Sequence, residues 1–275
     1  MMTVPGMITK KPRLINDVEF NSLLINCRSL KPKLKSLVAN FEMNKSHVAM
    51  LTETWCYKSD SQLKKMLADI EDKSDICLLR KDRDSRGGGV AIAFNKNTCK
   101  FSKLALNSLR RTKFEIVGAA GKINGIKKEH LVFSCYLPKS YNRSQTDEFF
   151  EILTDTISEA RATHPGAWLT IGGDWNECSF SPIALNFPDL DWIRSGPTRK
   201  RKTLDIIVTN YRDLVTKVFT NAPLESEIGT ISDHKVLAVE ALLTRPQSFA
   251  WETHEYLKIT TEGKARFADM IKNGN

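Results

Sequence analysis

The chain has 275 residues, 41% of them hydrophobic, which allows one large or two small domains with a packed core. Lys and Arg outnumber Asp and Glu by 41 to 32, and the net charge of +9 favours a polyanionic partner. No segment approaches the roughly 20 apolar residues of a membrane span, and the first residues lack the apolar stretch of a signal peptide. We therefore expect an intracellular protein that is neither secreted nor bound to a membrane.

The first part of the chain alternates strands and helices. After a flexible polar lead over residues 1–18, the predicted strands are Ser22–Asn26, Val48–Thr52, Ile76–Leu79 and Gly89–Phe94, and the predicted helices are Lys33–Glu42 and Asp60–Ile70. This order is typical of an α/β fold.

The middle of the chain predicts an antiparallel hairpin followed by a long helix. Phe114–Ala120 and His130–Tyr136 are β-prone runs joined by a polar turn over residues 121–128. Ser144–Arg161 repeats apolar residues every four positions, with Ser144 and Asp147 at capping-box spacing and Pro165-Gly166 as a stop.

Strands dominate again toward the end, at Trp168–Gly172, Leu204–Thr209, Val215–Thr220 and Val236–Leu242. Mixed sheets with helices on their outer faces suit this order. Residues 244–275 end in a weakly helical, Lys-rich stretch, Thr261–Lys272. They are either an ordinary frayed tail or the beginning of a further part of a longer protein.

Six cysteines are scattered without a Cys-x-x-Cys pair. They are Cys27, Cys56, Cys77, Cys99, Cys135 and Cys178, and several lie in apolar runs. We expect reduced, buried thiols.

Polar side chains stand at the ends of apolar runs in five segments. They are Asn26, Glu53, Asp174 with Asn176, Asp205, and Ser232-Asp233-His234. Buried strands that deliver these side chains to one point would form an active site.

The acidic members of this set imply a cation. Each pair of carboxylates at about 4 Å would cost on the order of 4 kcal/mol at an effective dielectric of 20. Oxygen ligands suit Mg²⁺, and no His/Cys cluster indicates zinc. Singly, each acid also has a structural interpretation: Glu53 as a helix cap, Asp174 in the Gly172-Gly173 turn, and Asp205 paired with Arg199 or Lys202.

His234 adds a group that changes charge near neutral pH beside an acid. The other histidines, His47, His130, His164 and His254, have no strand-end acids beside them, and we expect surface or turn positions for them. Two carboxylates, a His-Asp pair and two amides suit phosphodiester hydrolysis, whose transition state gathers negative charge. Gly87-Gly88-Gly89 lacks the Lys-Ser/Thr of a P-loop.

Six ordered motifs resemble the endonuclease/exonuclease/phosphatase superfamily over roughly residues 19–243. They are Asn26, Thr52-Glu53, Tyr136, Gly173-Asp174-x-Asn176, Leu204-Asp205 and Ser232-Asp233-His234. Further motifs resemble the apurinic-endonuclease-like domain of LINE-type non-LTR retrotransposons: Asn26-x-Arg28-Ser29-Leu30 with Lys33, Thr52-Glu53-Thr54-Trp55, Arg86-Gly87-Gly88-Gly89-Val90-Ala91, and Thr198-Arg199 ahead of Leu204-Asp205.

The resemblance implies a four-layered α/β sandwich, with two packed mixed β-sheets flanked by helices and the active site at one edge. It implies that Glu53 binds Mg²⁺, for which Mn²⁺ can substitute. Asn26 would bind the metal or hold one of its ligands or the phosphate. Asp174 would position and deprotonate the attacking water, and Asn176 would orient that water. The resemblance implies no organic cofactor.

The same resemblance implies the roles on the phosphate side. His234, paired with Asp205, would contact the scissile phosphate and stabilise its developing charge. Asp233 would serve the metal or the leaving group. Tyr136 matches the phosphate-contacting tyrosine of the superfamily, and a strand-end core aromatic is the alternative.

Three departures refine the implied activity. Trp175 stands between Asp174 and Asn176 as a packing variation, Arg28 replaces an aspartate that assists the metal in abasic-site repair enzymes, and no Trp precedes Leu204. Nicking of intact DNA is therefore favoured over abasic-site repair. The Arg-containing motifs of the inositol phosphatase branch are missing.

The basic run before Asp205 is the predicted DNA contact. The resemblance places a hairpin that enters the minor groove at Thr198, Arg199, Lys200, Arg201 and Lys202, and Arg28 completes the predicted DNA-binding set. Arg side chains favour narrow, A-tract-like minor grooves, which gives a T/A-rich target.

The sequence thus predicts a Mg²⁺-dependent DNA endonuclease over residues 19–243 that nicks one strand and leaves a 3′-hydroxyl for target-primed reverse transcription. Its partners would be double-stranded DNA and the RNA and reverse transcriptase of the element, with residues 244–275 leading to the latter. We expect a monomeric domain that acts in the nucleus after import from the cytoplasm. The alternatives are a cellular phosphodiesterase or abasic-site repair nuclease of the same superfamily, or an inactive, domesticated DNA-binding module.

Overall fold

The computed structural model describes residues 17–84, 87–179, 181–193, 195–227, 229 and 231–244, which belong to one compact unit. The predicted lead, apart from its last two residues, the predicted helix Thr261–Lys272 and His254 lie outside the described residues. None of the described helices is both long enough and apolar enough to cross a membrane.

The first sheet has six strands in the order β11-β12-β1-β2-β4-β3. Their bounds are β1 Asp17–Asn26, β2 Val48–Thr52, β3 Ile76–Lys81, β4 Val90–Asn95, β11 Val215–Asn221 and β12 Val236–Thr244. β1 and β2 are parallel, and the other neighbours are antiparallel, so the sheet is mixed.

The second sheet also has six strands, in the order β5-β6-β7-β8-β10-β9. Their bounds are β5 Cys99–Lys103, β6 Glu115–Ile123, β7 His130–Tyr136, β8 Trp168–Asp174, β9 Asp191–Ile193 and β10 Asp205–Thr209. Its single parallel pair is β7 and β8, so both sheets place one parallel pair near the middle.

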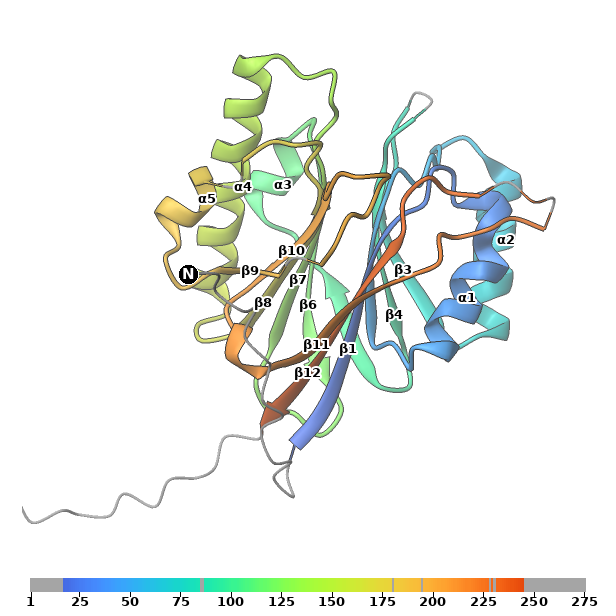
Figure 1. The fold of residues 1–275 in the computed structure, drawn as a ribbon, viewed down its shortest axis with the longest axis horizontal. Coiled ribbons are helices and arrows are strands. Elements are labelled where there is room, and N and C mark those ends of the chain that lie inside the picture. The colour runs from blue at the N-terminus through green and yellow to red at the C-terminus, as the bar shows by residue number, and fades with distance from the viewer. Residues whose placement is uncertain are drawn as a thin grey trace, which may run out of the picture. The chain divides into compact units, whose positions relative to one another are not determined.

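The helices cover the two outer faces, as Figure 1 shows, with α1 and α2 beside the first sheet and α3, α4 and α5 beside the second. Their bounds are α1 Leu34–Met43, α2 Ser61–Lys73, α3 Asn107–Arg111, α4 Arg143–Thr163 and α5 Ser181–Asn186, with two 3-10 turns, η1 Lys31–Lys33 and η2 Arg212–Leu214. The predicted four-layered α/β sandwich is confirmed. All ten predicted strands and the three predicted helices within the described residues are present.

Three buried clusters hold these layers together. One fills the space between the two sheets, one lies between the second sheet and α4, and one lies between the first sheet and α1 and α2. Trp175 belongs to the second cluster, where its ring is 1% exposed and stacks on Phe150. The interpretation of Trp175 as a packing residue agrees with this position.

Two local predictions are wrong. The capping box of α4 is formed by Asn142 and Gln145 rather than by Ser144 and Asp147, because the chain already turns into the helix at Arg143. His130 is not at the surface: it is 0% exposed between the sheets, where its Nε2 lies 2.7 Å from the hydroxyl of Thr170. All six cysteines are free thiols, and Cys77 and Cys178 are only partly buried.

The strand register brings the predicted site to one edge. Asn26 pairs with Thr52 across the parallel strands β1 and β2, so Glu53 follows at the same end. Tyr136 pairs with Asp174, and Asp174 pairs with Asp205. β12 runs antiparallel to β1, and the residues just before β12 therefore reach that same end.

Candidate active site

The strand tips at this edge are shaped by left-handed backbone. Six non-glycine residues here have positive φ: Arg28, Ser29, Glu53, Trp55, Asn176 and Glu177. Such conformations cost of order 1–3 kcal/mol each and persist only where the surroundings enforce them. Their concentration at the ends of β1, β2 and β8 marks this edge as a functional one.

Asn26 joins the two sheets at the centre of the constellation. Its Nδ2 donates to Oε1 of Glu53 and to Oδ2 of Asp174, at 2.9 Å in each case. Its Oδ1 accepts from the backbone N–H of Arg28 at 3.1 Å. Because every polar atom of this buried amide is engaged, Asn26 fixes the relative position of two carboxylates that come from different sheets.

His234 and Asp205 form a buried pair. Nδ1 of His234 lies 2.7 Å from Oδ2 of Asp205, and Nε2 of His234 lies 3.9 Å from Oδ2 of Asp174. No described residue hydrogen-bonds Oδ1 of Asp205, which is buried. An unsatisfied buried carboxylate oxygen is costly, so a ligand or a water at this position would be stabilised.

The pKa values of this group are shifted by burial and by mutual charge. Burial raises the pKa of Asp174 to about 7, the charge of Asp205 adds to the rise, and His234 opposes it. For His234, burial lowers the pKa, but the hydrogen bond and charge of Asp205 and the charges of Asp174 and Asp233 outweigh it, so its pKa is raised. Perturbed groups that share one buried site are typical of catalytic centres.

Ser232 and Asn176 brace the constellation through the backbone. Oγ of Ser232 donates to the carbonyl of Asn26 at 2.7 Å, which ties the end of β1 to the segment before β12. The backbone N–H of Asn176 donates to Oδ1 of Asp174 at 3.1 Å, and its Nδ2 donates to the carbonyl of Leu137 at 2.9 Å.

Tyr136 lies at the same edge, partly buried at the end of β7. Burial is the main cause that raises the pKa of its hydroxyl. The nearby charges of Glu53, Asp174 and Glu115 and a hydrogen bond to Glu53 raise this pKa further. The phenol therefore stays protonated and serves as a hydrogen-bond donor.

Asp233 faces outward and is held by two arginines. Its Oδ2 lies 3.4 Å from Nη1 of Arg28 and 2.5 Å from Nη2 of Arg199. All three side chains are partly exposed, and such surface pairs add little stability. These pairs instead position the loops, because the pair with Arg199 connects the basic hairpin to the segment that carries His234.

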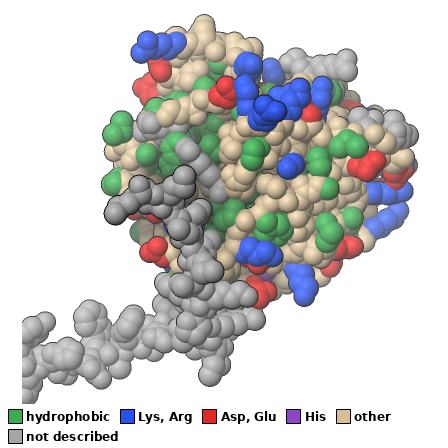
Figure 2. Space-filling view, in the orientation of Figure 1, with side chains coloured by type: hydrophobic (Ala, Val, Ile, Leu, Met, Phe, Trp, Pro, Cys, Tyr) green, Lys and Arg blue, Asp and Glu red, His purple; other side chains and the backbone are tan. Residues whose placement is uncertain are grey.

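The basic hairpin over residues 198–202 is closed by backbone bonds between Arg199 and Lys202, with Lys200 at φ 52 in the turn. Lys200 and Arg201 are exposed, and Lys202 pairs with Glu177. Figure 2 shows Lys and Arg side chains gathered at the upper edge of this face of the molecule, where the tips of the strands lie in Figure 1.

Thr198 departs from its predicted role in DNA binding. It is 0% exposed, and its Oγ1 accepts from the N–H groups of Leu204 and Asp205 at 3.1 and 3.2 Å. A buried hydroxyl with these partners cannot reach DNA. It anchors the base of the hairpin directly to Asp205.

The donors of the edge fit a hard cation. Ligand atoms of Asp174, Asp205 and His234 lie within 4.8 Å of one another, and Glu53 is joined to Asp174 through Asn26. The unpaired Oδ1 of Asp205 leaves acceptor capacity among buried carboxylates. Carboxylate and amide oxygens of this kind are ligands that Mg²⁺ prefers.

Two further polar groups at this edge were not predicted as site residues. Lys33 is 1% exposed, and its Nζ donates to the carbonyls of Cys27 and Arg28 at 2.7 Å each. Glu115 is 4% exposed and pairs with Arg83. Glu115 could have been identified by the pattern that identified the other acids, which is a charged residue where an apolar strand meets a loop.

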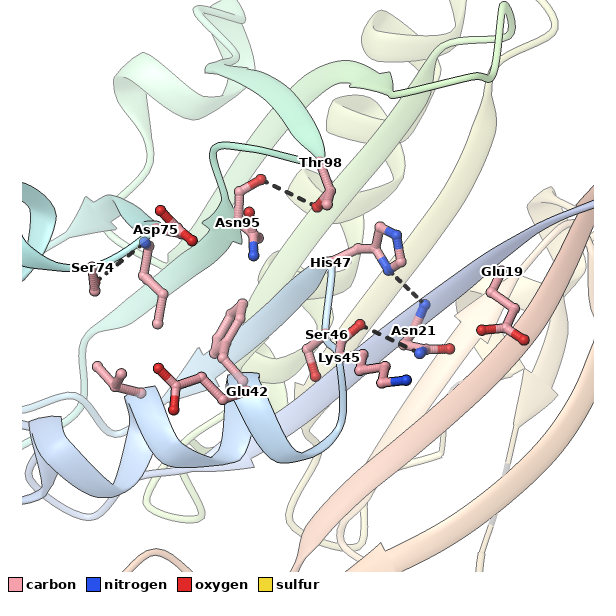
Figure 3. A pocket seen from close by; sticks show the side chains of 13 residues that line it. Glu19, Asn21, Glu42, Lys45, Ser46, His47, Ser74, Asp75, Asn95 and Thr98 are labelled. Carbon is pink, nitrogen blue, oxygen red and sulfur yellow. Dashed lines mark hydrogen bonds between the residues drawn. The ribbon is translucent and has the colours of Figure 1, made fainter.

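A pocket at the opposite end of β1 and β2 is separate from this site. Figure 3 shows Glu19 and Asn21 of β1 and His47, just before β2, among its lining residues. The backbone N–H of Asn21 donates to Nδ1 of His47 at 3.2 Å. The strand register places this pocket at the other edge of the first sheet from Asn26 and Glu53.

No protein-family model matches the chain, and no curated protein matches it. Solved structures do. The endonuclease domain of TRAS1, a telomere-specific non-LTR retrotransposon, is 14% identical, with a TM-score of 0.59 over 82% of this chain and 99% of that one. This chain has the endonuclease/exonuclease/phosphatase fold.

Two further structures share this endonuclease/exonuclease/phosphatase fold. The 3′ phosphatase NExo from Neisseria, bound to a product DNA hairpin, is 14% identical with a TM-score of 0.61, over 81% of this chain and 99% of that one. The endonuclease/exonuclease/phosphatase from Bacteroides vulgatus is 12% identical with a TM-score of 0.59, over 83% and 100%. At these identities the likeness concerns the fold.

Proposed function

We propose that this protein is a Mg²⁺-dependent DNA endonuclease that nicks one strand of double-stranded DNA. The observation that carries the proposal is the buried chain of contacts from Glu53 through Asn26 to Asp174, with Nε2 of His234 3.9 Å from Asp174. It unites a base, a phosphate-binding imidazole and oxygen ligands for a metal. Phosphodiester hydrolysis uses this combination.

Asp174 is the proposed base. Asn176 would orient the water that Asp174 deprotonates. A carboxylate whose pKa is raised to about 7 accepts a proton more readily than an ordinary one. The N–H of Asn176 holds Oδ1 of Asp174, which leaves Oδ2 directed toward Asn26 and His234. The attacking water would bind beside Oδ2.

His234 is the proposed phosphate contact. Asp205 accepts from Nδ1 and raises the pKa of the ring, which favours the imidazolium form, in which Nε2 also carries a proton and faces the site. It would donate to a non-bridging oxygen of the scissile phosphate, and Tyr136 would donate to another. Nδ1 of His234 is held by Asp205 before the reaction, so the ring is already oriented toward the developing charge, whereas Tyr136 would move its single proton from Glu53 to the phosphate oxygen.

The proposed metal would be held by Glu53, with Asn26 as a ligand or as support and Asp233 on the leaving-group side. Bound there, Mg²⁺, or Mn²⁺ in its place, would neutralise negative charge on the phosphate and the leaving oxygen. In the structure Asp233 is engaged by Arg28 and Arg199. Its role toward a metal stays a prediction.

DNA is the proposed substrate, with Arg28, Arg199, Lys200, Arg201 and Lys202 as its contacts. These cations surround the edge that carries the site, and the net charge of +9 favours a polyanion. The likeness to TRAS1 and to a DNA-bound 3′ phosphatase supports this choice of substrate.

The finer proposal is that residues 19–243 form the endonuclease domain of a non-LTR retrotransposon. The nick would leave a 3′-hydroxyl that primes reverse transcription of the RNA of the element by a reverse transcriptase beyond residues 244–275. The domain would act as a monomer in the nucleus. The motifs that resemble such elements and the likeness to TRAS1 support this proposal.

Plasmid nicking tests the proposed function. Supercoiled plasmid is incubated with Mg²⁺ or EDTA and with wild type, Asp174→Ala or His234→Ala. We expect nicking with Mg²⁺ only, and a loss of roughly 100-fold or more in each variant. Equal nicking by all three proteins would show contamination or a wrong site.

Parallel assays address the alternatives. A preference for abasic duplex over intact plasmid would favour a repair nuclease, and hydrolysis of a phosphoinositide would favour a cellular phosphodiesterase. DNA binding without any hydrolysis would identify an inactive, domesticated module.

A further inference from the structure

Glu115 is a buried carboxylate with two specific partners. It begins β6, directly opposite Tyr136 of β7, and its side chain is 5% exposed. One carboxylate oxygen accepts from the N–H of Gly89 at 2.5 Å, and the other lies 3.1 Å from Nη1 of Arg83. Burial of a charge is unfavourable unless it is paired and hydrogen-bonded, so this arrangement requires both partners.

Gly88 makes room for this carboxylate, and Gly89 makes room for Thr54. A Cβ on Gly88 would lie 2.5 Å from both oxygens of Glu115, and a Cβ on Gly89 would lie 2.5 Å from Oγ1 of Thr54. Gly88 and Gly89 also have φ of +63° and +83°, which side chains rarely adopt. The triglycine motif therefore allows close approach to Glu115 on one side and to Thr54 on the other.

The turn over Gly88 and Gly89, called the glycine turn below, also holds the segment after β2. The N–H of Thr54 donates to the carbonyl of Gly89 at 3.1 Å, and the N–H of Trp55 donates to the carbonyl of Gly88 at 2.8 Å. These two bonds hold the backbone directly after the left-handed residue Glu53, at φ 48, and at the left-handed residue Trp55, at φ 53. Strained residues of this kind persist where neighbouring contacts enforce them.

The conformation of Glu53 decides where its carboxylate points. As the structure has it, Oε1 of Glu53 meets Nδ2 of Asn26 at 2.9 Å and so joins the buried constellation. With an extended backbone at position 53, the side chain would leave from the opposite side of the chain. The position of the proposed metal ligand thus depends on the glycine turn.

We propose that Glu115 is a positioning residue for metal binding. It fixes the glycine turn, and through Thr54 and Trp55 this turn keeps Glu53 in its left-handed conformation. The inference rests on the proposed function, in which Glu53 binds the metal. Residues that orient a metal ligand typically change affinity by about 10- to 100-fold when they are removed.

The test measures metal binding apart from catalysis. Mn²⁺ binding is followed by electron paramagnetic resonance, and nicking is followed against Mg²⁺ concentration. Glu115→Ala should raise about tenfold both the Mn²⁺ concentration at half-maximal binding and the Mg²⁺ concentration at half-maximal nicking. The nicking rate at saturating Mg²⁺ should stay within about threefold of wild type. Glu115→Gln keeps an oxygen for the N–H of Gly89 and should restore most of the affinity.

Glu159→Ala is the matched control. Like Glu115, Glu159 accepts from backbone N–H groups, in its case those of Asn107 and Ser108, but these belong to α3, away from the site. Its loss should lower the melting temperature and leave both metal midpoints unchanged. Glu115→Ala with only that same fall in melting temperature would overturn the inference.

Gly88→Ala provides a second, independent variant if Glu115→Ala does not fold. The added Cβ would push the turn away from Glu115 without changing a charge, and should also raise the Mn²⁺ midpoint. An unchanged midpoint would again overturn the inference. If wild type itself neither binds Mn²⁺ nor nicks DNA, the proposed function fails instead.

Discussion

Nδ1 of His234 and Oδ2 of Asp205 lie 2.7 Å apart although the two residues come from different sheets. Asp205 begins β10 of the second sheet, and His234 precedes β12 of the first. The hydrogen bond therefore spans the sandwich at the edge that carries the site. It fixes the ring so that Nε2, rather than Nδ1, faces Asp174.

Asp205→Asn tests this relationship without much change in shape. An amide lacks the charge that raises the pKa of His234, so we expect that pKa to fall and the imidazolium form to be less favoured. Nicking should decrease by about 100-fold or more. The imidazole titration followed by NMR and plasmid nicking measure the two effects.

Asp213→Asn, in the η2 turn, is the control for this substitution. It should leave both the titration of His234 and the nicking rate unchanged. Full activity of Asp205→Asn with an unshifted histidine would contradict the proposed role of the pair.

We expect the basic hairpin to determine where DNA is cut rather than how fast it is cut. Arg199→Ala together with Arg201→Ala should change the pattern of cleavage sites on a labelled duplex, because these two side chains lie beside the site but are neither the proposed base nor the proposed phosphate contact. Arg199 also holds Asp233, so Arg201→Ala alone serves to separate the DNA contact from that ion pair. An unchanged pattern in the double variant would remove the hairpin from DNA recognition.

DNA affinity should depend strongly on salt. If four to six phosphates are neutralised, the logarithm of the affinity should fall against the logarithm of the salt concentration with a slope of about −4 to −5. Replacing both exposed residues Lys200 and Arg201 with Ala should make the slope shallower by about 2. Lys64→Ala with Lys65→Ala, on the exposed part of α2, should leave the slope unchanged. Fluorescence anisotropy across a salt series measures this slope.

The sequence was informative where burial follows a simple period. Strands such as β2 and β8 are buried at every described position, and continuous apolar runs identify them. The polar side chains of five segments at strand ends could be grouped for the same reason. Three-residue β9 is too short to leave a pattern, and β5 alternates only through Cys99 and Phe101.

The contacts between loops could not be predicted from the sequence. The bonds that Gly89 donates to Glu115 and that Lys33 donates to the carbonyls of Cys27 and Arg28 depend on backbone turns with positive φ. Thr198 was misread because a hydroxyl within a basic run gives no sign that it turns inward. His130 was misread because its partner Thr170 lies on the neighbouring strand β8.

His130 should make the stability of the fold depend on pH. Burial first, and then the charges of Lys128 and His47, lower its pKa to about 3. In the unfolded chain the pKa of this histidine is near 6.5. Below that pH the unfolded chain therefore binds a proton that the folded state does not bind. Stability from this group is fully present above about pH 6.5 and is lost as the pH falls toward 3, by up to about 1.4 kcal/mol per pH unit.

Urea denaturation of wild type and His130→Gln at several pH values between 4 and 7 checks this dependence. The glutamine variant should be less stable at pH 7, because the fit beside Phe20 and Thr170 is disturbed, but its stability should fall less steeply with acid. Equal slopes for wild type and His130→Gln would mean that other groups cause the acid sensitivity.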